Sequence, residues 1–120
     1  MLDANICIYV LEGGPTSLRR KIENEDPGAI ITSSIAYAEV MRGVMGDADK
    51  EAAAAKFFAV IQPLPFGRQE GLAYAALPFR RAGFDRLIAA HALALDLALI
   101  TNDQRDFTDV PGLRIENWTQ

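Results

Sequence analysis

The sequence predicts an α/β fold, a Rossmann-like α/β/α sandwich with a central, mostly parallel sheet. Short apolar runs of strand length alternate with longer segments of helical periodicity along the whole chain. Such alternation is typical of parallel strands joined by crossover helices that cover both faces of a sheet. The 120 residues are half hydrophobic and contain no repeat, low-complexity tract or linker. We therefore expect one domain over residues 1–120, with a core that needs no disulfide or structural metal.

Short apolar runs bounded by turn residues or by helical patterns are the expected strands. The first of them ends at Leu2. The others span residues 29–32, 61–65, 97–101 and 113–116.

Helical spacing of apolar residues fills the segments between these runs. Ser33 or Ser34 is a suitable N-cap for the second helix, and Pro78 would end or kink the fourth. The expected helices span residues 17–25, 35–46, 49–61, 69–81 and 85–95.

Charge and cysteine content exclude several classes of function. A net charge of −4 has the wrong sign for a protein that coats nucleic acid by neutralising phosphates, so such a role needs a local site, a bound cation or a basic partner. The single cysteine, Cys7, lies in an apolar run and is expected to be a small buried hydrophobe. Without a signal segment or an uninterrupted apolar span, we expect a soluble cytoplasmic protein with no membrane partner.

Two aspartates follow predicted strands closely. Asp3 comes after the first strand, and Asp103 comes after the strand at 97–101. Ligand sites of open α/β sheets lie beyond the carboxyl ends of the strands. Both carboxylates are therefore expected at one edge of the sheet.

Two further acids enter from helices that start at the same edge. Glu39 lies within the first two turns of its helix, and Asp85 opens another. Helix N-termini favour ionised carboxylates and also suit an incoming phosphate. The sequence thus predicts that four acids from distant segments meet in one cleft.

Several carboxylates in one cleft need a cation or a proton to offset their mutual repulsion. Two carboxylates ~4 Å apart repel each other by roughly 4 kcal/mol at an effective dielectric constant near 20, unless a proton or a cation lies between them. Oxygen ligands without histidine or thiolate favour Mg²⁺ or Mn²⁺, which bind phosphate alongside protein carboxylates. The predicted chemistry is metal-dependent cleavage of phosphodiester bonds.

The residues around these acids resemble the PIN-domain family and, within it, the VapC-type toxins of type II toxin–antitoxin pairs. The resemblance covers nearly the whole chain. It rests on the order and spacing of Leu2-Asp3-Ala4-Asn5, Ala38-Glu39, residues 84–92, Thr101-Asn102-Asp103 and residues 110–113.

This resemblance implies a Mg²⁺-dependent endoribonuclease that forms a homodimer and is inhibited by a cognate antitoxin, with which it assembles into a larger DNA-binding complex. It implies catalytic and metal-binding roles for the acidic quartet, which we define as Asp3, Glu39, Asp85 and Asp103. Asn5 and Thr101 match polar positions that support the quartet.

The sequence departs from the family pattern in two places. Ala4 stands where these toxins usually carry threonine, and the segment from 74 to 85 is shorter than usual. These departures leave open a catalytically impaired binding module with the same fold.

Each acid also has an ordinary structural explanation. Asp3 and Asp85 suit helix caps, Asp103 suits an Asx turn, and Glu39 stands three residues before Arg42, as in an exposed helical ion pair. These explanations would all have to coincide at the edge where the fold predicts a ligand site. We therefore favour the catalytic interpretation.

Basic residues near the quartet are candidates for RNA phosphate contacts, with solvated helix ends and surface ion pairs as the alternative. His91 is expected to serve in packing or at an interface rather than as a general base, because it is turned away from Asp85 on the helix. The candidate arginines are Arg80, Arg81, Arg86 and Arg105.

Two other families bind Mg²⁺ on related folds. A phosphoacceptor receiver domain needs an aspartate after the third strand and a lysine after the fifth, but the third predicted strand here leads into Phe66-Gly67 and no lysine follows the fifth. A haloacid-dehalogenase-type phosphatase needs an aspartate where Asn5 stands. Both alternatives fit the sequence less well than a ribonuclease.

Overall fold

Parallel pairing places the N-terminal segment at the centre of the sheet. In this computed structural model, which describes residues 1–26, 28–78 and 82–120, Leu2 forms parallel bridges with both Thr32 and Ile100. The strands pair in parallel on either side of it, β1 (Thr32–Ser33) with β2 (Pro63–Leu64), and β3 (Leu99–Ile100) with β4 (Ile115–Glu116). The order across the sheet is therefore β2, β1, the Leu2 segment, β3 and β4.

This order reverses direction at the central segment. The chain moves from Leu2 outward through β1 and β2, and then crosses to β3 and β4 on the other side. A reversal of this kind leaves a crevice beyond the carboxyl ends of the two strands where the order changes. Here those strands lead into Asp3 and Thr101.

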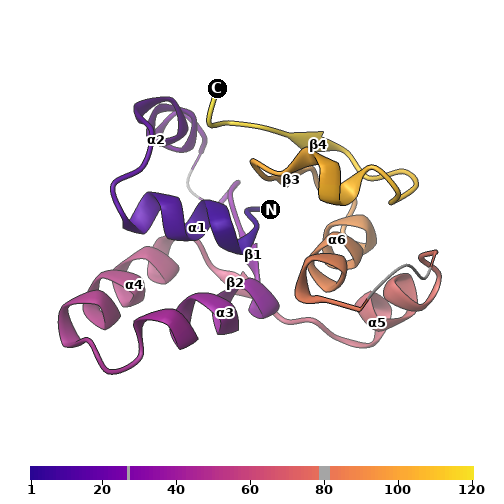
Figure 1. Cartoon of the computed structure of the whole chain (residues 1–120), viewed down its shortest axis with the longest axis horizontal. Coiled ribbons are helices and arrows are strands. Elements are labelled where there is room, and N and C mark those ends of the chain that lie inside the picture. The colour runs from indigo at the N-terminus through magenta and orange to yellow at the C-terminus, as the bar shows by residue number, and fades with distance from the viewer. Residues whose placement is uncertain (27, 79–81) are drawn as a thin grey trace.

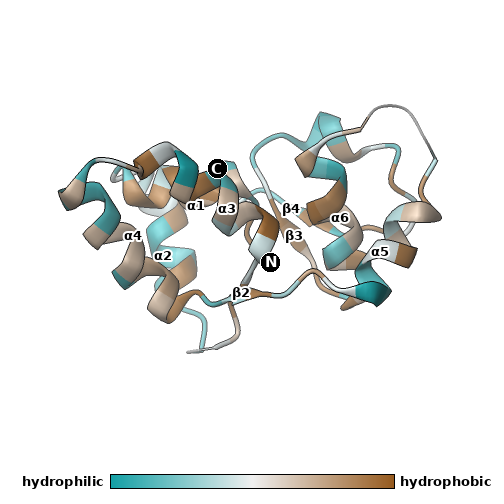
Figure 2. Cartoon of the chain, turned by 90° about the horizontal axis from the view of Figure 1, so that it is seen from below, coloured by the Kyte–Doolittle hydropathy of each residue, from teal (hydrophilic) through white to brown (hydrophobic). Residues whose placement is uncertain are grey.

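Helices cover both sides of the sheet. Figure 1 shows α1 to α4 gathered on one side and α5 and α6 on the other, and Figure 2 shows the same two groups from below. The predicted α/β/α arrangement is confirmed. The helices are α1 (Ala4–Leu11), α2 (Thr16–Glu23), α3 (Ser34–Val44), α4 (Ala48–Val60), α5 (Arg68–Ala75) and α6 (Phe84–Ala94), with a 3₁₀ turn η1 (Gln104–Phe107).

Helix α1 was not among the helices that periodicity predicts. Its residues are almost all apolar, and Ile6 and Cys7 have no exposed surface. Because apolar residues occur on all sides of this helix, it has no polar face to mark its period, so its periodicity is weak. Cys7 is confirmed as a buried hydrophobe, and burial raises the pKa of its thiol to about 12.

Capping side chains set the starts of α3 and α4. The Ser33 Oγ accepts a hydrogen bond from the Ile35 amide at 3.0 Å, so the predicted serine cap is confirmed. Asp47 caps α4 in the same way, through the Lys50 amide at 3.2 Å.

The strands and α5 differ from their predicted bounds. Each strand is only two residues long. Pairing next to β1 begins one residue earlier, because the Leu2 amide donates a hydrogen bond to the Ile31 carbonyl. Helix α5 ends at Ala75, ahead of Pro78, and so covers only part of the predicted helix. The last part of that prediction, residues 79–81, lies outside the described residues.

Two groups of buried side chains form the core. One lies among α1 to α4 and reaches Trp118, and the other lies under α6 and reaches Phe107. Both aromatic residues are buried. Among the described residues, no helix is both long and apolar enough to cross a membrane.

Candidate active site

Asp3 is a buried carboxylate at the end of the central segment. It is 4% exposed and caps α1, where its Oδ1 accepts a hydrogen bond from the Ile6 amide at 2.9 Å. The Asp3 amide donates to the Ile100 carbonyl at 3.1 Å, which fixes the residue against β3. Asp3 is therefore a helix cap, and the same contacts hold its carboxylate at the switch point of the sheet.

Thr101 connects two members of the quartet. Its side chain is fully buried and hydrogen-bonds to the Asp3 carboxylate, and its Oγ1 accepts from the Asp103 amide at 3.1 Å. A hydroxyl can donate to one group and accept from another at the same time. The contacts of Thr101 are those expected of a supporting residue.

Glu39 projects from the second turn of α3 and is partly buried. Its Oε1 atom is buried and has no hydrogen-bond partner among the described residues. A buried carboxylate oxygen without a donor is costly, and a proton or a cation is the usual remedy. This atom is the clearest sign that the site suits a proton or a cation.

Asp85 and Asp103 are exposed at the mouth of the site. Asp85 lies in the first turn of α6, whose N-cap is Gly83, so Asp85 is not the cap. Asp103 precedes η1, and its side chain makes no capping hydrogen bond. Neither side chain therefore caps its helix.

Electrostatics show that the quartet shares one region. Burial raises the pKa of Asp3, the Thr101 hydroxyl and the Ile6 amide oppose this, and the charges of Asp85 and Asp103 raise the pKa further. Burial also raises the pKa of Glu39, with added repulsion from Asp85 and Asp3. The structure thus brings all four predicted acids together.

The arrangement fits a hydrated ion better than a tightly caged one. In the described part of the chain, no three His, Cys, Asp or Glu side chains are placed to hold a metal directly. Mg²⁺ keeps several waters and commonly uses only one or two carboxylates, with phosphate oxygens completing its shell. Oxygen donors, mutual repulsion and the orphan Oε1 of Glu39 therefore fit Mg²⁺ or Mn²⁺.

Asn102 belongs to the site but was not assigned a role from the sequence. Its Nδ2 donates to the Tyr9 hydroxyl at 3.0 Å, and its Oδ1 is buried without a partner among the described residues. The sequence signal that could have identified Asn102 as a site residue was its position between Thr101 and Asp103. Asn5, the other predicted supporting residue, is exposed on α1.

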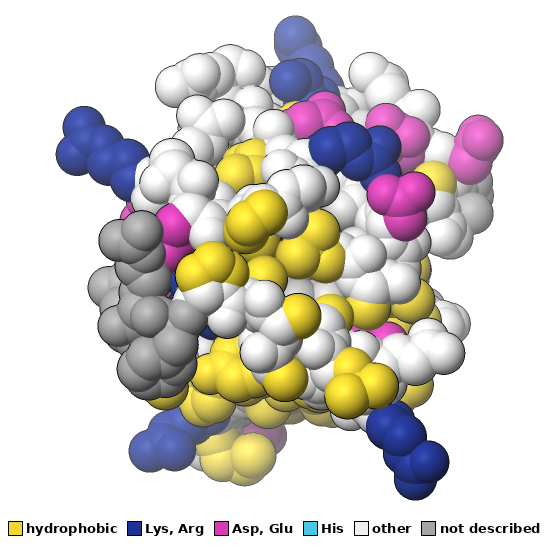
Figure 3. Space-filling model, turned by 90° about the vertical axis from the view of Figure 1, so that its right-hand side faces the viewer, with side chains coloured by type: hydrophobic (Ala, Val, Ile, Leu, Met, Phe, Trp, Pro, Cys, Tyr) yellow, Lys and Arg dark blue, Asp and Glu magenta, His cyan; other side chains and the backbone are white. Residues whose placement is uncertain are grey.

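Among the described residues, the basic side chains on one side of the molecule do not gather into one patch. On the side of the molecule that Figure 3 shows, which is the right-hand side of Figure 1, the Lys and Arg side chains lie apart from one another, and hydrophobic side chains fill much of the surface between them. Arg80 and Arg81, two of the predicted phosphate contacts, lie outside the described residues. Arg105 is exposed on η1.

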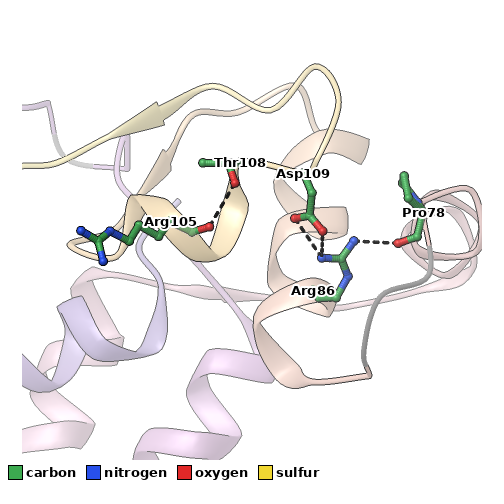
Figure 4. Close-up of polar contacts among 5 residues, drawn as sticks. All are labelled: Pro78, Arg86, Arg105, Thr108 and Asp109. Atoms are coloured by element: carbon green, nitrogen blue, oxygen red, sulfur yellow. Dashed lines mark hydrogen bonds and ion pairs between the residues drawn. The ribbon is translucent and has the colours of Figure 1, made fainter.

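Arg86 is not free to bind phosphate. It is 6% exposed, and its Nη1 donates to both carboxylate oxygens of Asp109, at 3.1 and 3.2 Å. Its Nη2 donates to the Pro78 carbonyl at 2.9 Å, while Arg105 extends away from this group (Figure 4). The guanidinium is used inside the protein, so we withdraw Arg86 as an RNA contact.

Comparison with known proteins identifies the family. The model of the PIN domain matches residues 1–113. The chain belongs to the PIN-domain family. The receiver and dehalogenase-type alternatives are thereby set aside.

Relatives of this PIN-domain protein are VapC ribonucleases. The tRNA(fMet)-specific endonuclease VapC of Shigella flexneri is 32% identical, over 99% of this chain and 97% of the relative. Ribonuclease VapC2 of Rickettsia felis is 33% identical, over 98% of this chain and 96% of the relative.

Solved structures agree in fold over the whole length. VapBC2 of Rickettsia felis, bound to a DNA fragment from its promoter, superposes with a TM-score of 0.86 at 29% identity, covering 98% of this chain and 97% of that one. DNA-bound VapBC of Salmonella typhimurium gives a TM-score of 0.89 at 26% identity, covering 98% and 96%. These relatives support an RNA-cleaving toxin of the VapC type.

Proposed function

We propose that this PIN-domain protein is a metal-dependent endoribonuclease and the toxin of a toxin–antitoxin pair. The observation that carries the proposal is the meeting of the acidic quartet at the switch point of the sheet, with the Glu39 Oε1 buried and unpaired. A site of this kind suits a divalent cation and a phosphodiester substrate.

The members of the quartet differ in how firmly they are held and in how exposed they are. Asp3 is fixed by the Ile6 amide and Thr101, so its carboxylate cannot swing away. Asp85 and Asp103 are exposed and can reach groups that arrive from solvent. When bound, Mg²⁺ or Mn²⁺ would polarise the scissile phosphate and lower the pKa of a water molecule. Attack by water predicts products with a 3′-hydroxyl and a 5′-phosphate.

The first RNA to test is initiator tRNA. The Shigella flexneri and Salmonella typhimurium relatives carry the name tRNA(fMet)-specific endonuclease, and each aligns with at least 98% of this chain. The same chemistry would cut any exposed phosphodiester, so substrate choice rests on surfaces outside the quartet.

The protein partners follow from the solved relatives. VapBC structures pair the toxin with its antitoxin, and some are bound to DNA. We propose a cognate antitoxin, a homodimer of this chain, and a larger DNA-binding assembly of the two proteins in the cytoplasm.

The decisive experiment is RNA cleavage by the purified protein. Labelled initiator tRNA, an elongator tRNA and a messenger RNA are incubated with Mg²⁺, with Mn²⁺ and with EDTA. We expect cleavage only with metal, and its loss in Glu39→Gln and Asp85→Asn variants that unfold as cooperatively as the wild type. Cleavage that survives EDTA or both substitutions would contradict the proposal.

A catalytically impaired binding module is the second candidate. Ala4 is 5% exposed and directly follows Asp3, so the hydroxyl usual at this position is absent beside a buried carboxylate. The module would bind its antitoxin without cutting any RNA class, and Ala4→Thr would restore cutting. Metal-dependent cleavage by the wild type would exclude this candidate.

A further inference from the structure

A groove opens beside the quartet, between α3 and the start of α6. Its volume is about 680 Å³, and its lining includes Ile35, Glu39, Met41, Arg42, Met45 and Phe84. Small-molecule and cofactor sites have volumes of about 300 to 1,000 Å³ and are mostly apolar with a few polar groups. The groove has this size and this kind of lining.

We propose that this groove is a nucleobase subsite, which takes the base of the RNA nucleotide next to the scissile phosphate. Phe84 stacks on the base, and Arg42 pairs with a phosphate of the same strand. This inference rests on the proposed ribonuclease function and extends it from the cleaved bond to the neighbouring nucleotide.

The exposed ring of Phe84 is the first argument. Phe84 is 59% exposed although it opens a helix whose later residues are buried. Single-stranded RNA is bound largely by stacking of its bases on aromatic side chains, and each stacked base contributes about 1–3 kcal/mol. Phe84 is the residue before Asp85 at the start of α6, so a base stacked on its ring would lie close to the quartet.

Continuity with the quartet is the second argument. Glu39 lines the groove and also carries the unpaired Oε1 atom of the acid site. A strand whose phosphate approaches the quartet therefore has the groove immediately beside it. The groove and the acid site therefore share the Glu39 side chain.

Charge is the third argument, because four acids repel RNA unless cations are close by. Arg42 is exposed and lies three residues after Glu39, on the same side of α3. Its guanidinium therefore brings a positive charge to the groove, where an RNA phosphate can pair with it. An acid, a cation and an exposed ring at one groove favour a nucleotide over a purely apolar occupant.

The experiment measures binding rather than cleavage. Fluorescein-labelled oligouridylate and an abasic ribose-phosphate strand of the same length are titrated with the full chain in Ca²⁺, and anisotropy is recorded. We expect Phe84→Ala to weaken oligouridylate binding roughly ten-fold and to leave abasic binding unchanged. Phe84→Trp should retain the affinity, and Arg42→Gln should weaken both strands.

Leu72→Ala is the matched control, because Leu72 is 68% exposed on α5 and does not line the groove. Equal loss on both strands, no loss on either, or no binding of oligouridylate by the wild type would overturn the inference. So would a Phe84→Ala variant that changes from dimer to monomer with unchanged base affinity, because the groove would then be a protein interface. Failure of the proposed function would instead appear as absent cleavage despite intact, base-dependent binding.

Discussion

The Arg86 guanidinium donates to both carboxylate oxygens of Asp109, 23 residues later in the chain. The same guanidinium holds the Pro78 carbonyl, so one buried side chain joins the first turn of α6 to the segments after α5 and after η1. Asp85 is its neighbour in sequence. This ion pair thereby fixes the turn that presents a member of the quartet.

We predict that breaking this pair is strongly destabilising. Asp109→Asn removes the counter-charge of the Arg86 guanidinium, which is 6% exposed, and losses of this kind cost about 3–5 kcal/mol. Urea denaturation measures the free energy of unfolding. Arg114→Gln is the control, because Arg114 pairs with Asp96 at 3.4 Å in an exposed position, where a loss below about 1 kcal/mol is expected. Equal losses in the two pairs would refute a special role for Arg86.

Removing the charge of Glu39 should stabilise the fold while it abolishes cleavage. The pKa of Glu39 is raised by burial, so its contribution to stability is present below the unfolded pKa and is lost as pH rises through the folded pKa. At neutral pH the ionised carboxylate therefore opposes folding, and Glu39→Gln removes this penalty. We expect a higher melting temperature for the variant at pH 7 and a shrinking difference toward pH 4.

Thermal melts of both proteins between pH 4 and pH 7 test the sign of the predicted difference in melting temperature. Glu25→Gln, an exposed substitution, serves as the control and should change little. A Glu39→Gln variant that is less stable than the wild type at pH 7 would show that Glu39 already has a compensating partner.

Divalent cations should stabilise the wild type through the quartet. A ligand that binds only the folded state adds RT ln(1 + [L]/Kd), or about 1.4 kcal/mol at a ten-fold excess over Kd. We expect Mg²⁺ and Mn²⁺ to raise the melting temperature by several degrees, and EDTA to reverse the shift. Asp3→Asn retains a capping side chain for α1 but removes a charge, so its shift should be much smaller. Equal shifts in variant and wild type, or in KCl of matched ionic strength, would place the effect elsewhere.

The convergence of the quartet was predictable because it follows from topology. Asp3 and Asp103 come shortly after strands that had to be parallel, and parallel strands end at one edge. The pattern also located the starts of α3 and α6. Exact strand lengths were not predictable, since each strand pairs over only two residues and short apolar runs do not encode where pairing stops.

Other features depend on distant residues and escaped prediction. The burial of Arg86 depends on Asp109, and a lone arginine near acids suggests a phosphate contact rather than an internal pair. Helix α1 has apolar residues on all sides, and several of them are only partly buried against the core, so no polar face marked it as a helix. Asn102 became significant only when the fold placed Tyr9 beside it.

His91 should make stability depend on pH in the opposite sense to Glu39. The ring is 1% exposed, its Nδ1 lies 2.8 Å from the Ser33 Oγ, and Phe66 packs edge-on against it. Burial lowers the pKa of His91, and the charge of Glu70 on α5 only partly offsets this. The unfolded chain therefore binds the proton more tightly than the folded one.

The sign of the His91 effect follows from that difference. Stability is full above the unfolded pKa, near 6.5, and falls as pH drops from there through the lower folded pKa. His91→Gln cannot titrate, so its melting temperature should change less than that of the wild type between pH 7 and pH 5. Measuring both proteins in the Glu39→Gln background removes the opposing contribution of that carboxylate. Parallel pH profiles for the two proteins would show that His91 is protonated equally in both states, and that its buried ring has a counter-charge besides Glu70.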